Sequence, residues 1–343
     1  MSSPKVSVVM PVYNGEKYVG AAISSILNQD FKDFELLVLD DGSVDASVKV
    51  ISSFTDKRIR FVQNERNIGL ISTLNKALKL VDSEYIVRMD GDDIAHGNRL
   101  STQVKFMDEN REVGASGSFY HAMLGDKKMY FDLPVSHDEI KCFLLFNCPL
   151  AHPTSIIRTS VLKKNNISYS ADFVNSEDYD FWSQISLVSK VVNIPQSLLD
   201  YRMHENQITG NPKHLAARNA SVNAIRMRHI AELKLSFNDE EMRIHNLVSD
   251  GLKPSSLSDI EAANLWFVKM LKWNQERVLL HHGFLQKIIF ERMLRFYINF
   301  YGVKGVLKFH RSELYNTIKL PLRHKIELFK NIFYSWKRKQ IKK

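Results

Sequence analysis

Three carboxylates follow an apolar run of strand-forming residues in the first third of the sequence. Asp90, Asp92 and Asp93 come directly after residues 85–89, whose sequence YIVRM is typical of a buried strand. Carboxylates held this close repel one another, so the cluster stabilises little unless a cation neutralises it. Their oxygens suit Mg²⁺ or Mn²⁺, which also accept substrate phosphate oxygens as ligands. The alternative is an ordinary acidic turn that caps the next helix.

Strands and helices alternate along the first half of the sequence. Short β-rich runs bounded by turn residues are each followed by a stretch whose apolar residues recur at helical spacing. This order predicts an α/β fold in which a mostly parallel sheet is covered by helices on both faces. The strands are expected at 6–14, 34–39, 59–63 and 85–89, and the helices at 16–29, 46–54 and 70–81.

The acidic cluster falls where open sheets of this kind bind their ligands, beyond the carboxyl ends of the strands. Tyr13, Asp41 and Asp92 each lie just past a predicted strand, so three separate segments should meet at one edge. The sequence contains neither the glycine pattern of a dinucleotide-binding turn after the first strand nor that of a P-loop. A metal ion held by aspartates is then the means left for holding a phosphate.

Six short motifs occur in the order and approximate spacing of a known enzyme family. The sequence resembles the inverting family 2 glycosyltransferases with the GT-A fold, of the bacterial surface-polysaccharide type, over roughly residues 4–206. The resemblance implies a Rossmann-like GT-A catalytic domain over residues 1–210, which the helical, basic region 211–343 follows. The motifs are VSVVMPVYNGEKYV, LDDGSVD, RNIGL, YIVRMDGDD, HPTSIIR and SEDYDFW.

The resemblance assigns donor-side roles to several of these residues. It implies that Tyr13 stacks on the nucleotide base, that Asp41 accepts the imide hydrogen of a uracil, and that Arg66 contacts the base or a phosphate. Asp92 matches the metal-binding member of the family's DxD motif, and Asp90 its ribose-side partner. Without the family, Tyr13 fits a packed aromatic residue, Asp41 a turn residue and Arg66 a solvated loop charge. The implied donor-binding set is Pro11, Tyr13, Glu16, Asp41, Arg66, Asn67, Asp90 and Asp92.

The motif SEDYDFW supplies the base of the implied reaction. Asp178 matches the family's catalytic base, which takes the proton of an acceptor hydroxyl as that hydroxyl attacks the sugar. A divalent cation on Asp92 would stabilise the departing nucleoside diphosphate. A single displacement inverts the anomeric centre, so an α-linked donor gives a β-linked product. The structural alternative is a helix start, with Ser176 as N-cap and acidic residues favoured in the first turn.

Five further polar residues are weaker candidates for the site. Asp93 and Glu177 are sequence neighbours of the assigned carboxylates, and His152 matches a family position near the acceptor. Arg202 and His204 match the segment that ends the catalytic domain, where a polar residue can approach the pyrophosphate or the metal. For each lone histidine the alternative is a hydrogen-bonded scaffold residue.

The charge of the chain is unevenly distributed. The net charge is +9, yet acidic residues outnumber basic ones over residues 1–210, and the excess of Lys and Arg is greatest over 301–343. Past residue 211 we expect helices at 214–235 and 259–285, joined by a connector around GLKPSSLSD. The region is then either a small helical domain with a solvated basic tail, or a segment that contacts an anionic membrane surface.

Size and composition are those of a globular protein. The chain has 343 residues, of which 44% are hydrophobic and 25% charged. The spacing of Cys142 and Cys148 fits neither a disulfide framework nor a metal knuckle, so we expect reduced core thiols. The sequence contains no secretory signal and no apolar run near the roughly 18 residues of a membrane span. We therefore expect a cytoplasmic protein, or one peripheral to the inner face of the plasma membrane.

These observations lead to one hypothesis and two alternatives. The hypothesis is a glycosyltransferase of the hexosyltransferase type that uses Mn²⁺ or Mg²⁺ to move a sugar from a nucleotide-diphosphate donor. Among such donors a UDP-sugar fits best. Its acceptor would be a glycan or lipid-linked glycan of polysaccharide, capsule or lipopolysaccharide synthesis. The alternatives are a metal-dependent nucleotidyltransferase and a non-catalytic sugar-nucleotide binder. A nucleic-acid partner is not expected, because it would explain the basic end but not the acidic cluster.

Overall fold

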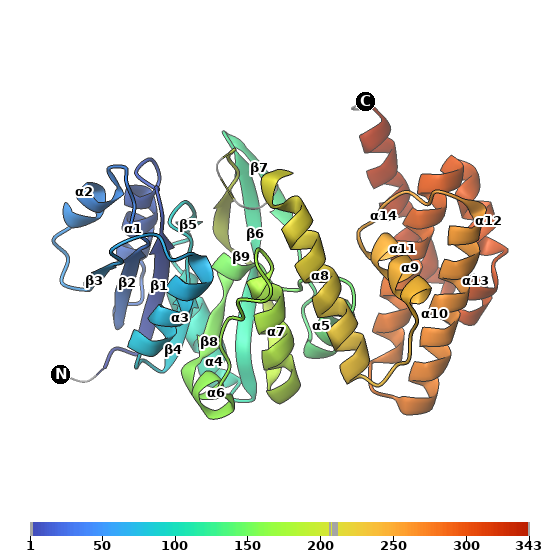
Figure 1. Cartoon of the computed structure of the whole chain (residues 1–343), viewed down its shortest axis with the longest axis horizontal. Coiled ribbons are helices and arrows are strands. Elements are labelled where there is room, and N and C mark those ends of the chain that lie inside the picture. The colour runs from blue at the N-terminus through green and yellow to red at the C-terminus, as the bar shows by residue number, and fades with distance from the viewer. Residues whose placement is uncertain (1–2, 206, 208–211, 342–343) are drawn as a thin grey trace. The chain divides into compact units, whose positions relative to one another are not determined.

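The computed structural model describes residues 3–205, 207 and 212–341, with backbone alone at 212–213 and 334–341. It divides into two compact units (Figure 1). The first comprises Met1–Ile140 and Cys148–Ile225, and the second comprises Lys141–Asn147 and Arg226–Lys343. The boundary expected between residues 210 and 211 lies outside the described residues and stays a prediction.

Within the described part of the first unit, the strands form one nine-stranded sheet in the order β3-β2-β1-β4-β8-β6-β9-β5, with β7 paired to β6. The first four strands of this order are parallel, whereas β8 runs antiparallel to both β4 and β6. The sheet is therefore mixed, and the expected parallel arrangement applies to its first half. The strands are β1 (Val6–Val12), β2 (Phe34–Asp40), β3 (Ile59–Gln63), β4 (Tyr85–Arg88), β5 (Ile94–Ala95), β6 (Val113–Leu124), β7 (Lys127–Phe131), β8 (Ile156–Arg158) and β9 (Lys190–Arg202).

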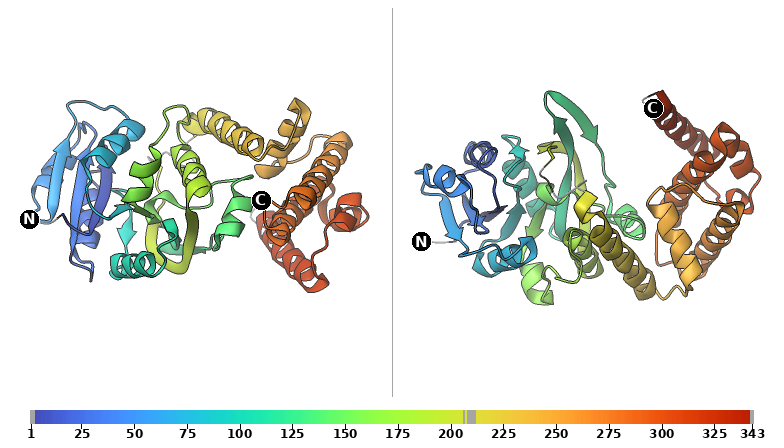
Figure 2. Two further views of the ribbon diagram at one scale, coloured as in Figure 1. Left: turned by 90° about the horizontal axis from the view of Figure 1, so that it is seen from below. Right: turned by 45° about the horizontal axis from the view of Figure 1, so that its top comes forward.

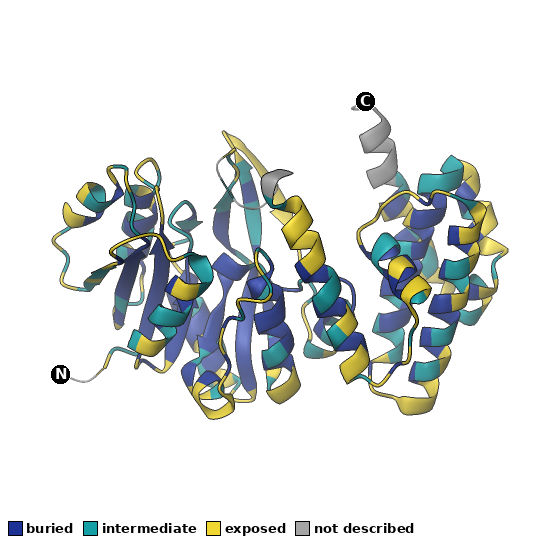
Figure 3. Ribbon diagram, in the orientation of Figure 1, coloured by how far each residue is buried: buried dark blue, intermediate teal, exposed yellow. Residues whose placement is uncertain are grey.

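Helices cover both faces of this sheet (Figure 2). Every residue of β1 and of β4 is buried because both faces of these strands are covered, and β2 has a single residue that is only partly buried (Figure 3). One face packs its alternate residues Val6, Val8 and Met10 into a core shared with α1 and α4. The helices are α1 (Val19–Leu27), α2 (Ser47–Ser52), α3 (Leu70–Leu80), α4 (Arg99–Glu109), α5 (His137–Phe143), α6 (Thr159–Asn165), α7 (Glu177–Val188) and α8 (Pro212–Glu232).

The second unit is helical and has a core of its own. Large apolar side chains such as Trp266, Phe267 and Phe296 are almost completely buried within it. Among the described residues, no helix is both long enough and apolar enough to cross a bilayer. Its helices after α8 are α9 (Asp239–Ser249), α10 (Leu257–Arg277), α11 (His282–Tyr301), α12 (Gly305–His310), α13 (Glu313–Thr317) and α14 (Leu322–Ile341).

The expectation of helix throughout residues 259–285 is wrong at one point. Helix α10 ends at Arg277, and Val278 has a left-handed backbone with φ of 54°. The Asn274 side chain closes the following turn through two 3.0 Å hydrogen bonds with the backbone N–H and carbonyl of Leu280. The buried amide of Asn274 therefore stabilises a break that the apolar spacing does not reveal.

Candidate active site

The acidic cluster lies at the carboxyl end of β4 and is built around a buried arginine. The Arg88 side chain is 5% exposed and forms an ion pair with Asp90. One carboxylate oxygen from each of Asp90, Asp92 and Asp93 lies within 4.8 Å of the other two. The sequence analysis did not select Arg88, although a charged residue in an otherwise apolar strand was a usable signal.

The electrostatics of the cluster favour a bound cation. Burial and then the charge of Asp90 raise the pKa of Asp92, and burial with both neighbouring carboxylates raises the pKa of Asp93 well above its usual range. Within the described residues, the buried Oδ2 of Asp93 has no hydrogen-bond partner. An all-oxygen donor set with excess negative charge fits Mg²⁺ or Mn²⁺ better than a softer metal ion.

The end of β9 brings two of the weaker candidates onto this loop. His204 Nε2 lies 2.9 Å from Asp92 Oδ2. Arg202 donates its backbone N–H to Asp93 Oδ1 (2.8 Å) and its Nε to the Asp92 carbonyl (2.9 Å). The Tyr18 ring, which the sequence analysis missed, packs against the His204 ring at 4.9 Å and beneath the Arg202 guanidinium at 4.8 Å.

The ends of β1, β2 and β4 meet at this edge, as the sequence predicts. The backbone N–H of Asp41 donates to the Val12 carbonyl (2.8 Å). A Cβ added at Gly91 would lie 3.1 Å from the Val12 side chain and 3.6 Å from the Pro11 carbonyl. The absence of a side chain at Gly91 thus lets the acidic loop approach the end of β1.

The Asp41 carboxylate anchors the loop that follows β3. It accepts hydrogen bonds of 2.9 Å from Asn64 Nδ2 and from the backbone N–H groups of Ile68 and Gly69. Gly42 has φ of 71°, and a Cβ there would lie only 2.5 Å from the carbonyl carbon of Arg66. These two loops are therefore closely packed at the predicted base-binding side.

The remaining donor-side candidates lie on the same group of loops. Glu16 Oε2 accepts the backbone N–H of Ala46 (2.8 Å), and Asn67 Oδ1 accepts that of Gly69 (3.0 Å). The Tyr13 side chain is 50% exposed, and Arg66 is also exposed. Glu16 and Asn67 thus have local structural contacts, whereas Tyr13 and Arg66 present surface to solvent.

The predicted base lies at the start of α7 in a carboxylate pair. Burial raises the pKa of Asp178, and burial together with Asp178 raises the pKa of Glu177 to about 7. The positive charge of Arg88 favours the ionised form of both. Cys148 donates from its Sγ to Asp178 Oδ2 at 3.6 Å, a contact that its interpretation as a plain core thiol missed.

The capping alternative for this segment is partly met. Ser176 stands at the N-cap position, but its hydroxyl donates to the Asn175 carbonyl and makes no cap with the helix. The Asp178 carboxylate accepts the backbone N–H of Tyr179 (2.8 Å). Only Oδ1 of Asp178 makes this contact with the helix backbone, whereas Oδ2 accepts from the Cys148 thiol. Capping therefore explains the position of one carboxylate oxygen and not of the other.

His152 is placed in the core. It is 7% exposed, its Nε2 lies 2.8 Å from the Tyr169 hydroxyl, and its ring packs edge-on against Trp182. Burial and then Arg88 lower the pKa of His152 well below its usual range, so the ring is neutral. These contacts are those of a hydrogen-bonded scaffold residue.

Known proteins resemble this chain in sequence. The profile of the family described as "Glycosyl transferase family 2" matches residues 7–165. An uncharacterized glycosyltransferase of Haemophilus influenzae is 33% identical over 223 residues, which cover 62% of this chain and 69% of that protein. The Escherichia coli protein named UDP-Glc:alpha-D-GlcNAc-diphosphoundecaprenol beta-1,3-glucosyltransferase WfgD is 30% identical over 216 residues, covering 60% of this chain and 80% of that protein.

A solved structure supports the fold over nearly the whole length. S. aureus TarS 1–349, crystallised with UDP-GlcNAc, superposes with a TM-score of 0.57 at 19% identity, covering 97% of this chain and 92% of that one. At this identity the likeness shows the GT-A fold alone. Taken with the family match and the two relatives, it leads to one conclusion: the chain is a glycosyltransferase that belongs to family 2.

Proposed function

We propose that the protein transfers a sugar, with inversion, from a UDP-sugar to a hydroxyl group of a glycan or lipid-linked glycan. The observation that carries this proposal is that one buried cation, Arg88, favours the ionised forms of Asp92 and Asp93 and also that of Asp178. The name of WfgD, with its UDP-glucose donor and lipid-linked acceptor, and the UDP-GlcNAc bound to TarS support the donor and acceptor classes. Membership in the family favours this reaction over nucleotidyl transfer and over a non-catalytic binder.

On the donor side, Asp92 would hold Mn²⁺ or Mg²⁺ with help from Asp93, because their carboxylate oxygens lie within 4.8 Å of one another, and His204 Nε2 contacts Asp92 Oδ2. When bound, such an ion neutralises charge on the leaving diphosphate. Asp90, held by Arg88, faces the ribose side in this proposal. Arg202 is positioned by its bonds to the loop, and its guanidinium packs on Tyr18.

The nucleotide base would bind between the loops after β1, β2 and β3. Asp41 has four acceptor positions and uses three on the chain, so one remains for an imide N–H. Tyr13 offers an exposed ring for stacking, and Arg66 an exposed cation. Pro11, Glu16 and Asn67 would shape these loops.

On the acceptor side, Asp178 would take the proton of the attacking hydroxyl. A carboxylate whose pKa is raised by burial is a stronger base than one in water, and Arg88 keeps its ionised form accessible. The thiol of Cys148 donates to Oδ2 and fixes the orientation of the carboxylate. Glu177 lies beside Asp178, whose charge opposes the ionisation of Glu177.

Replacing Asp178 with Asn tests the base. We expect turnover to fall by about 10²- to 10⁴-fold, because the amide cannot accept a proton, while the affinity for UDP stays unchanged. Turnover is measured as UDP release from the UDP-sugar that raises the melting temperature most, and affinity by calorimetry. Asp172→Asn, an exposed carboxylate in the same unit, is the matched control. Full turnover in the Asp178 variant would remove the assigned role.

The raised pKa of Glu177 predicts a pH-dependent stability. The folded pKa is about 7 and the unfolded value 4.5, so its contribution to stability is present below pH 4.5 and is lost as the pH rises through 7. The Glu177→Gln variant has no titrating group here and so no such loss. The difference between the free energy of unfolding of the variant and that of the native protein should therefore rise by roughly 1–3 kcal/mol between pH 5 and pH 8. Urea unfolding followed by circular dichroism measures this. The exposed Glu65→Gln control should show no trend, and a flat difference for Glu177 would contradict the shift.

Replacing Asp92 with Asn tests the metal. In the native protein, Mn²⁺ should tighten UDP binding at least ~10-fold over a sample in EDTA, because Asp92 would hold the ion that neutralises the charge of the diphosphate. In Asp92→Asn the two affinities should be nearly equal, whereas the exposed Asp126→Asn should behave as the native protein. Calorimetric titrations with and without Mn²⁺ decide the matter. An undiminished Mn²⁺ effect in Asp92→Asn would place the ion elsewhere.

The basic C-terminal end is proposed to contact an anionic membrane surface, which would suit a lipid-linked acceptor. Its last lysines and arginines lie among residues 334–343, whose side chains are outside the described structure. The truncated protein should keep every residue up to Phe333, because Leu328 and Ile332 pack in the core of the second unit. Each basic residue near an anionic surface contributes ~1 kcal/mol, so removing residues 334–343 should sharply reduce flotation with anionic liposomes. Equal flotation by both proteins, or no dependence on anionic lipid, would disprove this contact.

A further inference from the structure

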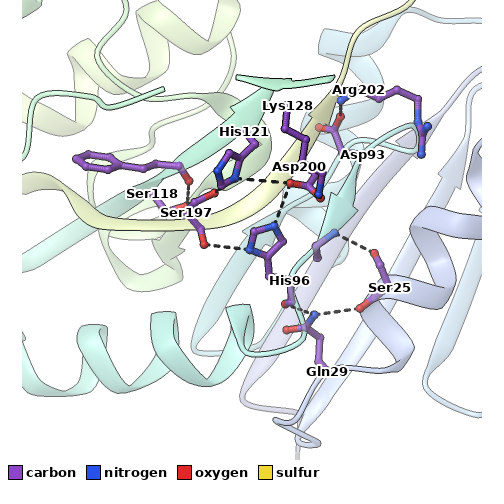
Figure 4. A network of polar contacts seen from close by, with 12 residues as sticks. Ser25, Gln29, Asp93, His96, Ser118, His121, Lys128, Ser197, Asp200 and Arg202 are labelled. Atoms are coloured by element: carbon purple, nitrogen blue, oxygen red, sulfur yellow. Dashed lines mark hydrogen bonds and ion pairs between the residues drawn. The ribbon is translucent and has the colours of Figure 1, made fainter. Parts of the chain in front are cut away.

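A second polar cluster lies on the other side of the short strand β5. It consists of His96, which follows β5, His121 on β6 and Asp200 on β9, and their side chains point toward one another (Figure 4). His96 Nε2 lies 3.1 Å and His121 Nδ1 3.8 Å from the same oxygen, Asp200 Oδ1. All three ligand atoms lie within 4.8 Å of one another. None of these residues belongs to the proposed donor or acceptor site.

A neutral His96 ring cannot satisfy both of its polar partners. Its Nδ1 lies 3.0 Å from the backbone carbonyl of Ser197, which can only accept a hydrogen bond. Its Nε2 faces the carboxylate of Asp200, which in its ionised form can also only accept. A neutral imidazole carries one N–H and satisfies one of these partners, so either the ring is doubly protonated or a cation lies between Nε2 and the carboxylate.

His121 is arranged as a ligand. Its Nδ1 lies 2.8 Å from the Ser197 hydroxyl, which can donate a hydrogen bond to a bare ring nitrogen. In the register of the sheet, His121 pairs directly with Asp200, so the two side chains project from neighbouring strands. Without an ion, the lone pair of His121 Nδ1 accepts the Ser197 hydroxyl, and a bound ion would take the place of this hydrogen bond.

The spacing suits a tetrahedral ion. With metal–ligand bonds of about 2.0–2.1 Å, the edge of a zinc tetrahedron is roughly 3.3 Å long. Two of the observed separations, 3.1 and 3.8 Å, are close to this edge, and the third, between the two rings, is at most 4.8 Å, so the rings would close on a bound ion. Two imidazoles and one carboxylate favour Zn²⁺ over Mg²⁺, and three protein ligands leave one position for water.

The outer contacts fit the same interpretation. Lys128 Nζ lies 2.6 Å from Asp200 Oδ2, which leaves Oδ1 as the single ligand oxygen. Although burial raises the pKa of Asp200, the hydrogen bonds from Lys128 and His96 lower it below its usual value, so the carboxylate is ionised. The Ser197 carbonyl fixes the tautomer of His96, as backbone carbonyls do for metal-bound histidines.

We propose that His96, His121 and Asp200 form a binding site for a Zn²⁺-type ion, separate from the oxygen-only cluster of Asp90, Asp92 and Asp93. The rings of His96 and His121 are about one-third exposed, so an ion can enter from solvent. The ion would tie β5 to β6 and β9. This inference does not depend on the proposed donor or acceptor.

Metal stoichiometry tests the site. The full-length protein, freed of metal, is dialysed against Zn²⁺ with excess Mg²⁺ to occupy the acidic cluster. We expect one Zn²⁺ per chain in the native protein and in Asp92→Asn, and its loss in the His96→Gln/His121→Gln double variant. His324→Gln, which changes an exposed histidine outside this cluster, is the matched control and should retain the ion. Replacing Zn²⁺ with Co²⁺ should give visible absorption typical of tetrahedral nitrogen and oxygen ligands in the proteins that bind, and none in the double variant.

The opposite results are equally clear. Equal Zn²⁺ content in the native protein and the double variant would overturn the site, as would loss of the ion in Asp92→Asn alone. If the native protein binds no Zn²⁺ and proton NMR shows a doubly protonated His96 ring at neutral pH, the charge at Nε2 is a proton and the site is disproved. The single variant His121→Gln, checked by circular dichroism, separates loss of a ligand from loss of the fold and should bind at least ~10-fold more weakly than the native protein.

Discussion

The buried guanidinium of Arg88 is the charge on which the acidic edge of the sheet depends. It pairs with Asp90 at the end of β4 while its side chain is 5% exposed. Removing one partner of a buried ion pair typically costs 3–5 kcal/mol, because the other charge is left unpaired. The same positive charge favours ionisation of four further carboxylates, namely Asp92, Asp93, Glu177 and Asp178.

One guanidinium cannot neutralise so many carboxylates, and this imbalance connects stability with function. Arg99, also buried, supports the strand end by donating to the Arg88 carbonyl (2.7 Å), yet the pKa of Asp93 remains strongly raised. The folded protein therefore either retains protons on these groups or acquires a cation. A ligand that brings a divalent ion with its phosphates relieves this repulsion on binding, so part of its affinity comes from charge that the fold has already concentrated.

The sequence was informative where local pattern determines structure and uninformative where distant residues decide it. Apolar periodicity located the first four strands, and the carboxylates after β4 identified the acidic loop. The direction of β8 could not be predicted, because three residues contain no information about which neighbours they pair with. The left-handed Val278 was missed since valine rarely adopts that conformation, and the Asn274 amide that stabilises the turn lies within an otherwise regular helical pattern. Cys148 and Tyr18 were missed for a different reason, because their partners lie far away in the sequence.

Strand β9 determines where both polar clusters lie. Strand β5 has only two residues and pairs with β9 through Ile94 and Asp200, so β9 fixes its position. Asp93 precedes β5 and accepts the backbone N–H of Arg202, whereas His96 follows β5 and contacts Asp200. A charge bound between His96 and Asp200 would restrain β5 from one end and thereby hold the Asp92–Asp93 loop at the other. Restraining a loop before a ligand arrives lowers the entropy lost on binding, so the second cluster could affect donor affinity without touching the donor.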